Sequence, residues 1–336
     1  MRPQDLLHPR PEGLYCPPGD FYIDPMRPVP RALITHGHSD HARAGHGAVM
    51  ATADTLAIMG LRLGAGFCAA QQIAPLRERV DVNGVAVTFF PAGHVLGSAQ
   101  IRLAHKGLSI VISGDYKRQE DATALPFEPV ACDIFVTEAT FGLPVFRHPD
   151  PAGEIAKLLA RRAAEPERAI LIGAYALGKA QRVISLLRQA GHDAPIHLHG
   201  ALEKVTGYYA ETGITLGDLR KVAASDKAAL AGAIILCPPS SLHDVWARRF
   251  PEPLTAVASG WMRVRARARQ NGAELPLILS DHADWPGLQQ TIRETGASDI
   301  WVTHGEEDAL VHWCQSIGLA ARPLRLVGYG DEAEGA

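Results

Sequence analysis

The segment that most restricts how this chain can fold is THGHSDH, residues 35–41, which places three imidazoles and a carboxylate within six positions. It follows a short apolar run, so a strand is expected to end where the polar side chains begin. A loop this short cannot pack four such groups among apolar neighbours. Imidazole nitrogen and carboxylate oxygen are good zinc ligands at about 2 Å. The segment therefore predicts a metal site at the end of a strand.

Two more polar residues stand at comparable places further along the chain. His94 ends the segment PAGH (91–94) and Asp115 ends SGD (113–115), and each comes after a β-like run. Any one of these histidines can also be an ordinary solvated or hydrogen-bonded side chain. Together with residues 35–41, however, they indicate ligands that gather from several strand ends around two adjacent ions.

Length and composition fit a folded chain of more than one domain. The chain has 336 residues, with 47% hydrophobic and 21% charged, which suggests two domains of ordinary size. Its longest apolar runs, such as 170–177, are well short of the roughly 18 to 20 residues that cross a bilayer. The first residues lack the pattern of a secretory signal. We therefore expect a cytoplasmic protein with no membrane contact.

Charge and cysteine content exclude other classes. The net charge of −3 argues against a nucleic-acid binder that works through overall positive charge, but leaves a local basic channel open. The five cysteines are scattered and form no C-x-x-C pair. A disulfide framework or a thiolate zinc site is not expected.

The apolar periodicity changes along the chain. Short strands are predicted at 32–35, 86–90, 101–103, 108–113 and 134–137. Helices are predicted at 151–164 and 179–189, and further strands at 169–172, 234–237, 276–280 and 299–303. This later alternation of strand and helix favours a parallel sheet, so we predict an α/β protein.

The order of the histidine and aspartate motifs resembles the metallo-β-lactamase fold, an αββα sandwich with a two-zinc site at one edge. Asp24, in FYID (21–24), resembles the first motif of that fold, a carboxylate that supports the metal loop. The resemblance implies one zinc held by three histidines, a second held by an aspartate and a histidine, and an aspartate between them. In that order these are His36, His38 and His94, then Asp40 and His41, then Asp115.

Later segments resemble the β-CASP nucleases of that fold. Glu138 lies in TEATFG (137–142), His282 in LSDHAD (279–284) and His304 in VTHGE (302–306), while YALGKAQR (175–182) resembles a cap-domain helix start. The resemblance implies a sandwich from residues 1–145 and 275–336, with a β-CASP cap at 146–274 inserted between. It assigns catalysis to Asp40, Glu138 and His282, and a place in the second zinc shell to His304.

The implied chemistry is hydrolysis of a phosphodiester. Two divalent ions, zinc or alternatively manganese, about 3.5 to 4 Å apart can activate water and hold phosphate oxygens. A histidine held by a carboxylate can give a proton to the leaving oxygen, which is the role expected of His282 and Glu138.

Substrate contacts are expected from a run of arginines. WMRVRARAR (261–269) places arginines at every second position, so an extended chain would carry Arg263, Arg265 and Arg267 on one side as a phosphate track. A solvated strand or connector is the alternative. Lys179, at a predicted helix start, can bind phosphate or be paired internally. His197 and His199 repeat the H-x-H spacing but lack the Asp-His continuation, so we do not expect them to bind metal.

Within the β-CASP group, SDHADW (280–285) and SGWMRVRARAR (259–269) resemble the ligase-associated DNA exonucleases. This implies a zinc-dependent exonuclease of DNA repair, acting on single-stranded DNA or DNA ends, with an ATP-dependent DNA ligase and a helicase as partners. His304 departs from many DNA-cutting members and favours RNA processing, which stays open as the alternative. A hydrolase of small esters and a non-catalytic nucleic-acid binding module are further hypotheses.

Overall fold

The computed structural model describes residues 1–222 and 230–324 and shows a mixed α/β chain with three sheets. Its described residues separate into two compact units, 1–147 with 282–324 and 148–222 with 230–281. The parts of the expected 146–274 and 275–336 segments at 223–229 and 325–336 lie outside the described residues. Within the described ranges, no helix is long and apolar enough to span a membrane.

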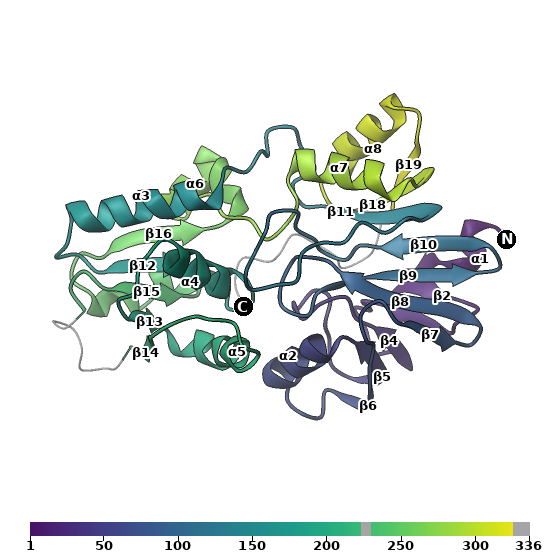
Figure 1. The fold of residues 1–336 in the computed structure, drawn as a ribbon, viewed down its shortest axis with the longest axis horizontal. Helices are drawn as coiled ribbons and strands as arrows, with labels where there is room; N and C mark the ends of the chain where they lie inside the picture. The colour runs from purple at the N-terminus through teal and green to yellow at the C-terminus, as the bar shows by residue number, and fades with distance from the viewer. Residues whose placement is uncertain (223–229, 325–336) are drawn as a thin grey trace. The chain divides into compact units, whose positions relative to one another are not determined.

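The first unit contains two sheets that share one core (Figure 1). The six-stranded sheet has the order β1-β2-β3-β4-β5-β6 and the seven-stranded sheet the order β19-β18-β11-β10-β9-β8-β7. Phe21 and Leu33 of the first sheet pack in one cluster with Val87 and Ile101 of the second. The two sheets therefore pack face to face over apolar side chains.

The strands of the six-stranded sheet are β1 (His8–Arg10), β2 (Gly13–Cys16), β3 (Phe21–Ile23), β4 (Arg31–Leu33), β5 (His46–Ala51) and β6 (Cys68–Ile73). Those of the seven-stranded sheet are β7 (Arg79–Val82), β8 (Val85–Pro91), β9 (Ala99–His105), β10 (Leu108–Ile112), β11 (Ile134–Ala139), β18 (Asp299–Gly305) and β19 (Ala320–Pro323). The helices of this unit are α1 (Pro3–Leu6), α2 (Ala53–Leu63), α7 (Trp285–Thr295) and α8 (Glu307–Ser316).

Helices cover the faces of these two sheets that point away from the shared core. Leu56 and Met59 of α2 pack on Ala32 and Val49 of the first sheet. The second sheet contributes its alternate face to a cluster with α7 and α8, which lie beside β18 in Figure 1. This cluster includes Val111, Phe135, Ile300, Leu288, Ile292 and Leu310. The packing thus runs from helix to sheet to sheet to helices.

The second unit is built on a parallel six-stranded sheet with the order β14-β13-β15-β12-β16-β17. Its strands are β12 (Ile170–Gly173), β13 (Ile196–Leu198), β14 (Leu219–Lys221), β15 (Ile234–Cys237), β16 (Leu254–Ala258) and β17 (Leu275–Leu277). Its helices are α3 (Pro151–Ala164), α4 (Lys179–Gln189), α5 (Gly200–Glu211) and α6 (Arg265–Gln270), with 3₁₀ turns η1 (Pro239–Leu242), η2 (Ala247–Arg249) and η3 (Gly260–Arg263). The parallel sheet predicted from the strand and helix alternation is confirmed.

Strand direction brings the polar segments of the first unit to one edge. In the seven-stranded sheet β10 runs parallel to β11, and β11 parallel to β18. Strand β8 is antiparallel to β9, which is antiparallel to β10, so β8 also points the same way. The carboxyl ends of all four strands therefore meet at one edge. Ala99 N donates to Thr35 O at 2.8 Å, which joins the loop after β4 to the same edge.

Candidate metal centre

Each of the seven side chains expected to bind metal follows or ends a strand of the first unit. The loop after β4 carries residues 36–41, the loop after β8 carries His94, and the loop after β10 carries Asp115. His304 lies in the last part of β18. Because those strands end at one edge, the ligands meet in space although they are far apart in sequence.

The first group of ligand atoms comes from three histidines and Asp115. His38 Nδ1 lies 3.1 Å from His36 Nε2 and 2.9 Å from His94 Nε2. Asp115 Oδ2 lies 3.4 Å from His36 Nε2 and 3.8 Å from His94 Nε2. The ligand atoms of all four residues fall within 4.8 Å of one another.

A second group shares Asp115 with the first. His41 Nε2 lies 3.5 Å from Asp115 Oδ2 and 3.6 Å from Asp40 Oδ2. These three residues also have ligand atoms within 4.8 Å of one another. Asp115 is therefore the single side chain that belongs to both groups, which is the place the sequence resemblance assigned to it.

The separations suit a divalent cation in each group. Ligands about 2.0 Å from a tetrahedral zinc ion are separated from each other by about 3.3 Å. The six distances given above scatter around that value, between 2.9 and 3.8 Å. Imidazole nitrogens that face one another this closely need a proton or a cation between their lone pairs. The donor set and its spacing therefore fit a metal pair.

The charge state of the groups also fits a cation. Burial, together with the neighbouring His41, holds the pKa of His36 well below its usual value, so this ring is neutral, as a metal ligand must be. Burial opposes the charge on His41, but Asp115, Asp40 and Asp24 outweigh it and raise the pKa of His41 well above its usual value, so a cation bound here would have to displace the proton of this ring. Burial likewise opposes the Asp115 carboxylate, whereas His41 and His282 hold its pKa well below its usual value. Asp115 is therefore a buried anion, which is the ligand a cation prefers.

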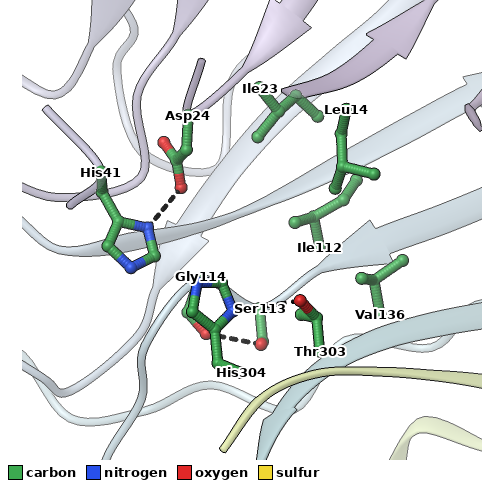
Figure 2. Close-up of a pocket in the computed structure, with 10 residues that line it drawn as sticks. All are labelled: Leu14, Ile23, Asp24, His41, Ile112, Ser113, Gly114, Val136, Thr303 and His304. Carbon is green, nitrogen blue, oxygen red and sulfur yellow. Dashed lines mark hydrogen bonds and ion pairs between the residues drawn. The ribbon is translucent and has the colours of Figure 1, made fainter. Parts of the chain in front are cut away.

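Asp24 and Thr35 fix the orientation of this loop, and Figure 2 shows Asp24 facing His41. Asp24 Oδ2 lies 2.8 Å from His41 Nδ1, which leaves the Nε2 of that ring directed at Asp115. The other carboxylate oxygen accepts from Thr35 N at 2.8 Å, and Thr35 Oγ1 donates to Oδ2 at 2.6 Å. A carboxylate behind a ligating histidine fixes its tautomer and ring direction. Asp24 can do this for His41.

His304 stacks on His41 with ring centroids 5.2 Å apart, but its nitrogens are not part of the two groups above. Burial and the neighbouring His41 lower the pKa of His304 to about 4, so its ring is neutral. Its φ is +59°, in the left-handed region that favours glycine. At the next position, Gly305 has a φ of +80°, and a Cβ there would lie 2.3 Å from Ala139 O. Gly305 therefore permits the close approach of β18 to the irregular end of β11.

Glu138 and His282 form a buried pair beside the metal groups. Both oxygens of Glu138 lie within 3.0 Å of His282 Nδ1. Glu138 is itself fixed by Tyr116 N at 2.9 Å and Thr140 N at 3.4 Å. The His282 ring lies 4.7 Å from the His94 ring, between centroids. The pair that the sequence resemblance predicted is therefore brought together, with the imidazole next to a group of candidate ligands.

Two positively charged side chains beside the site were not predicted from the sequence. Lys117 is buried, and its Nζ donates to His94 O at 3.2 Å and to Asp121 at 2.5 Å. Arg62, near the end of α2, donates to Gly37 O. Both side chains hold the backbone of a ligand-bearing loop. No sequence signal connected them to the site, because their partners come close only in the folded chain.

The residues expected to contact the substrate differ from the prediction in conformation or burial. The extended arginine track is wrong, because residues 260–263 form η3 and 265–270 form α6. Positions two apart on a helix point to different sides, and Arg267 lies over the Trp261 ring at 4.0 Å. Lys179 is buried, bonded to Leu279 O at 2.8 Å and to Asp281 at 3.0 Å. That is the internal pairing left open from the sequence.

The amino-acid sequence of this chain is similar to parts of several known proteins. It is 30% identical over 314 residues to a probable DNA ligase of Opitutus terrae, a match that covers 92% of this chain and 30% of that protein. It is also 30% identical over 241 residues to endoribonuclease ysh1 of Aspergillus fumigatus, covering 60% of this chain and 27% of that protein. Cleavage and polyadenylation specificity factor subunit 3 of Dictyostelium discoideum is 30% identical over 241 residues, covering 59% and 31%. The chain thus spans about a third of the length of these curated relatives.

Among the solved structures with a similar fold is a protein of unknown function from Enterococcus faecalis V583, with a TM-score of 0.58 and 12% sequence identity. The match covers 88% of this chain and 79% of that one. At that identity the likeness concerns the fold alone. No family model matches the chain.

Proposed function

We propose that this chain, which belongs to the β-CASP group of metallo-β-lactamase-fold proteins, is a divalent-metal-dependent nuclease. The observation that carries the proposal is the pair of ligand groups that share Asp115, with the buried Glu138–His282 pair beside them. The packing from helix to sheet to sheet to helices in the first unit suits an αββα sandwich. We assign the β-CASP cap, expected at 146–274, to the second unit, whose described residues are 148–222 and 230–281.

The metal-binding roles follow the two groups of ligand atoms. His36, His38 and His94 would hold one ion, and Asp40 and His41 the other, with Asp115 contributing to both. Such ions supply Lewis acidity, making water more acidic near neutral pH and neutralising charge on phosphate oxygens. We assign His304 to the shell around His41, on which it stacks. Zinc suits this donor set of imidazole and carboxylate, and manganese is the alternative.

The chain's own acid is His282. Glu138 accepts the Nδ1 proton of His282, and the opposite nitrogen of the ring is the one that would hold and release a proton. A nearby carboxylate stabilises the charged imidazole that must form before the proton is given to a leaving oxygen. Tyr116 N and Thr140 N keep the Glu138 carboxylate in place during that step.

We propose DNA as the substrate, with exonuclease action in repair. The support is the relative named a probable DNA ligase, in which the part matching this chain makes up 30% of the length. A nuclease that acts together with a ligase can prepare the ends that the ligase seals. An ATP-dependent DNA ligase is therefore one proposed partner, and a helicase is proposed from the resemblance to the ligase-associated exonucleases alone.

RNA is the second candidate. The relatives named endoribonuclease ysh1 and cleavage and polyadenylation specificity factor subunit 3 favour it. So does the histidine at position 304, which resembles the RNA-processing members.

One assay separates the two substrates. The purified chain is incubated with DNA and RNA strands of matched sequence, labelled at the 5′ or the 3′ end, with and without a chelator. We expect chelator-sensitive shortening of the DNA strand from one end. Cleavage of RNA alone would replace the DNA proposal with the RNA one, and turnover of neither strand would contradict the nuclease proposal.

A further inference from the structure

A cavity of about 200 Å³ lies at the carboxyl edge of the parallel sheet in the second unit. Strands β15, β12 and β16 lie side by side in that sheet and end at Cys237, Gly173 and Ala258. Apart from Asn271, which follows α6, the residues that line the cavity lie at those ends or in the loops and 3₁₀ turns just after them. In open parallel sheets, ligands bind outside the carboxyl ends of the strands. The cavity therefore lies where this architecture places a ligand.

The chemistry of the lining suits a flat, uncharged group with polar edges. Ring side chains come from Tyr175 and His243, and a thioether comes from Met262. Hydroxyl and amide groups come from Ser240, Ser259 and Asn271. Of the described residues around the cavity, none is an aspartate, glutamate, lysine or arginine. Stacking surfaces combined with hydrogen-bonding groups are the features that hold an unstacked nucleobase.

The walls of the cavity are held by internal contacts. His243 Nε2 lies 3.0 Å from Asn271 O, and Ser259 Oγ accepts from Trp261 N at 3.3 Å. Met262 is 5% exposed, so its side chain is fixed in the core beneath. A Cβ at Gly173 would lie 2.7 Å from Leu242, so glycine at the end of β12 allows η1 to close over the strand. The pocket is thus preformed.

Positive charge follows the cavity wall along the chain. Arg263 comes directly after Met262, and Arg265 begins α6. Both are exposed, and neither forms an ion pair with a carboxylate of the described residues. An uncharged pocket next to unpaired cations matches the two halves of a nucleotide, a neutral base and an anionic phosphate.

We propose that this cavity binds one unstacked base of a single-stranded nucleic acid, while Arg263 and Arg265 contact its phosphates. The inference rests on the proposed nuclease function, because it names the part of the substrate that the second unit holds. It also gives the arginine segment a role in the helical conformation that it adopts.

Binding of oligonucleotides with one base removed tests the proposal. The full chain carrying His282→Ala, which limits cleavage, is titrated with a short labelled single strand of the nucleic acid that the unsubstituted chain cleaves. A series of strands carries one abasic residue at each position in turn, and affinity is measured by fluorescence anisotropy. We expect about a 10-fold loss at one position, since stacking of a base contributes about 5- to 150-fold, and little change elsewhere.

A cavity-filling variant locates the effect. Ser240 is exposed and lines the cavity, so Ser240→Tyr fills it without removing a buried contact. We expect this variant to bind the intact strand about 10-fold more weakly. Removing a base at any position is then expected to cause little further loss of affinity. Ser240→Ala is expected to keep the loss of affinity at one abasic position. Ala156→Tyr, which adds the same ring on an exposed position of α3, is expected to keep it too.

Two results would overturn the proposal. Equal affinities for all abasic strands, measured with the cavity unfilled, would mean that no single base is held. A loss of affinity at one abasic position that persists in Ser240→Tyr would mean that the base is held elsewhere. Thermal melting of each variant shows whether it is folded. The proposed nuclease function fails separately, if the unsubstituted chain cleaves neither DNA nor RNA.

Discussion

Two H-x-H segments, one in each unit, have the same spacing and entirely different surroundings. In the first unit, His36 and His38 have ring centroids 4.9 Å apart and share their edge with His94 and Asp115. In the second unit, His197 lies within β13, and His199 caps α5 by accepting from Ala201 N at 3.0 Å. His199 also packs edge-on against Trp246. Among described residues, no group of possible metal ligands includes His197 or His199.

The difference teaches that the spacing of two histidines does not make a metal site. The 36–38 segment is joined by further ligands because β4, β8 and β10 end near one another. The 197–199 segment lies beside β14 and β15, and no neighbour among the described residues joins it in a group of possible metal ligands. Ligands from neighbouring strands decide the outcome.

The largest effect is expected from a substitution of the side chain that the two ligand groups share. Asp115→Asn removes the charge from the one side chain that both groups share. We expect cleavage to fall by about 10³-fold or more, because several kcal/mol of metal-dependent stabilisation are lost and each 1.4 kcal/mol is tenfold. Single-turnover cleavage of the labelled strand measures it. Activity within a few-fold of the unsubstituted chain would contradict the shared role of Asp115.

The next effect separates proton transfer from metal binding. His282→Ala leaves both metal groups complete, so bound metal is expected to stay unchanged while turnover falls about 10²- to 10⁴-fold. Metal content by elemental analysis and initial rates on the same preparation measure both. Loss of metal in this variant would show that His282 is a ligand and not the acid.

A third change tests the backbone that positions His304 and Glu138. Gly305→Ala adds a Cβ 2.3 Å from Ala139 O, at a φ of +80°. We expect a loss of about 2 to 4 kcal/mol in the free energy of unfolding, from left-handed strain and the clash together. Gly318→Ala is the matched control, because its φ is +84° and no atom lies within 4 Å. Equal losses in the two variants, measured by urea denaturation, would mean that the clash has no effect.

The smallest effect tests the H-x-H comparison itself. His199→Ala removes a helix cap, so we expect about 1 kcal/mol less stability and unchanged cleavage. His38→Ala, at the same position of the other segment, is expected to lose cleavage and one bound ion. Denaturation and rate measurements on the two variants give the contrast. Comparable losses of activity in both would place His199 in the active machinery.

Much of the regular structure could be predicted because its apolar spacing is local. The expected helices 151–164 and 179–189 match α3 and α4, and the expected strand 234–237 matches β15. Many elements were not predicted, among them β1 to β3, β5 to β7 and the helices α2, α5, α7 and α8. Short or weakly periodic segments are stabilised by partners distant in the chain. The arginine run was assigned the wrong period. Arginine and alanine favour helix, and the buried Ala268 lies on the inner side of α6.

The site itself divides in the same way. Residues 36–41 predict a cluster of metal ligands, because their polar side chains are close together in the sequence. That His94 and Asp115 meet them depends on strand direction. Their places after β-like runs indicated such a meeting, and the resemblance to a known fold supplied which residue binds which ion. Lys117 and Arg62 carried no signal, and the bond from Thr35 to Asp24 could not be predicted, since each of these contacts exists only after folding.

The most direct test of the metal pair is anomalous diffraction from a crystal of the full chain grown with zinc or manganese. We predict two ions on either side of Asp115, roughly 3.5 to 4 Å apart, one next to His36, His38 and His94 and the other next to Asp40 and His41. Anomalous density away from these side chains, or density for a single ion that Asp115 does not touch, would contradict the account.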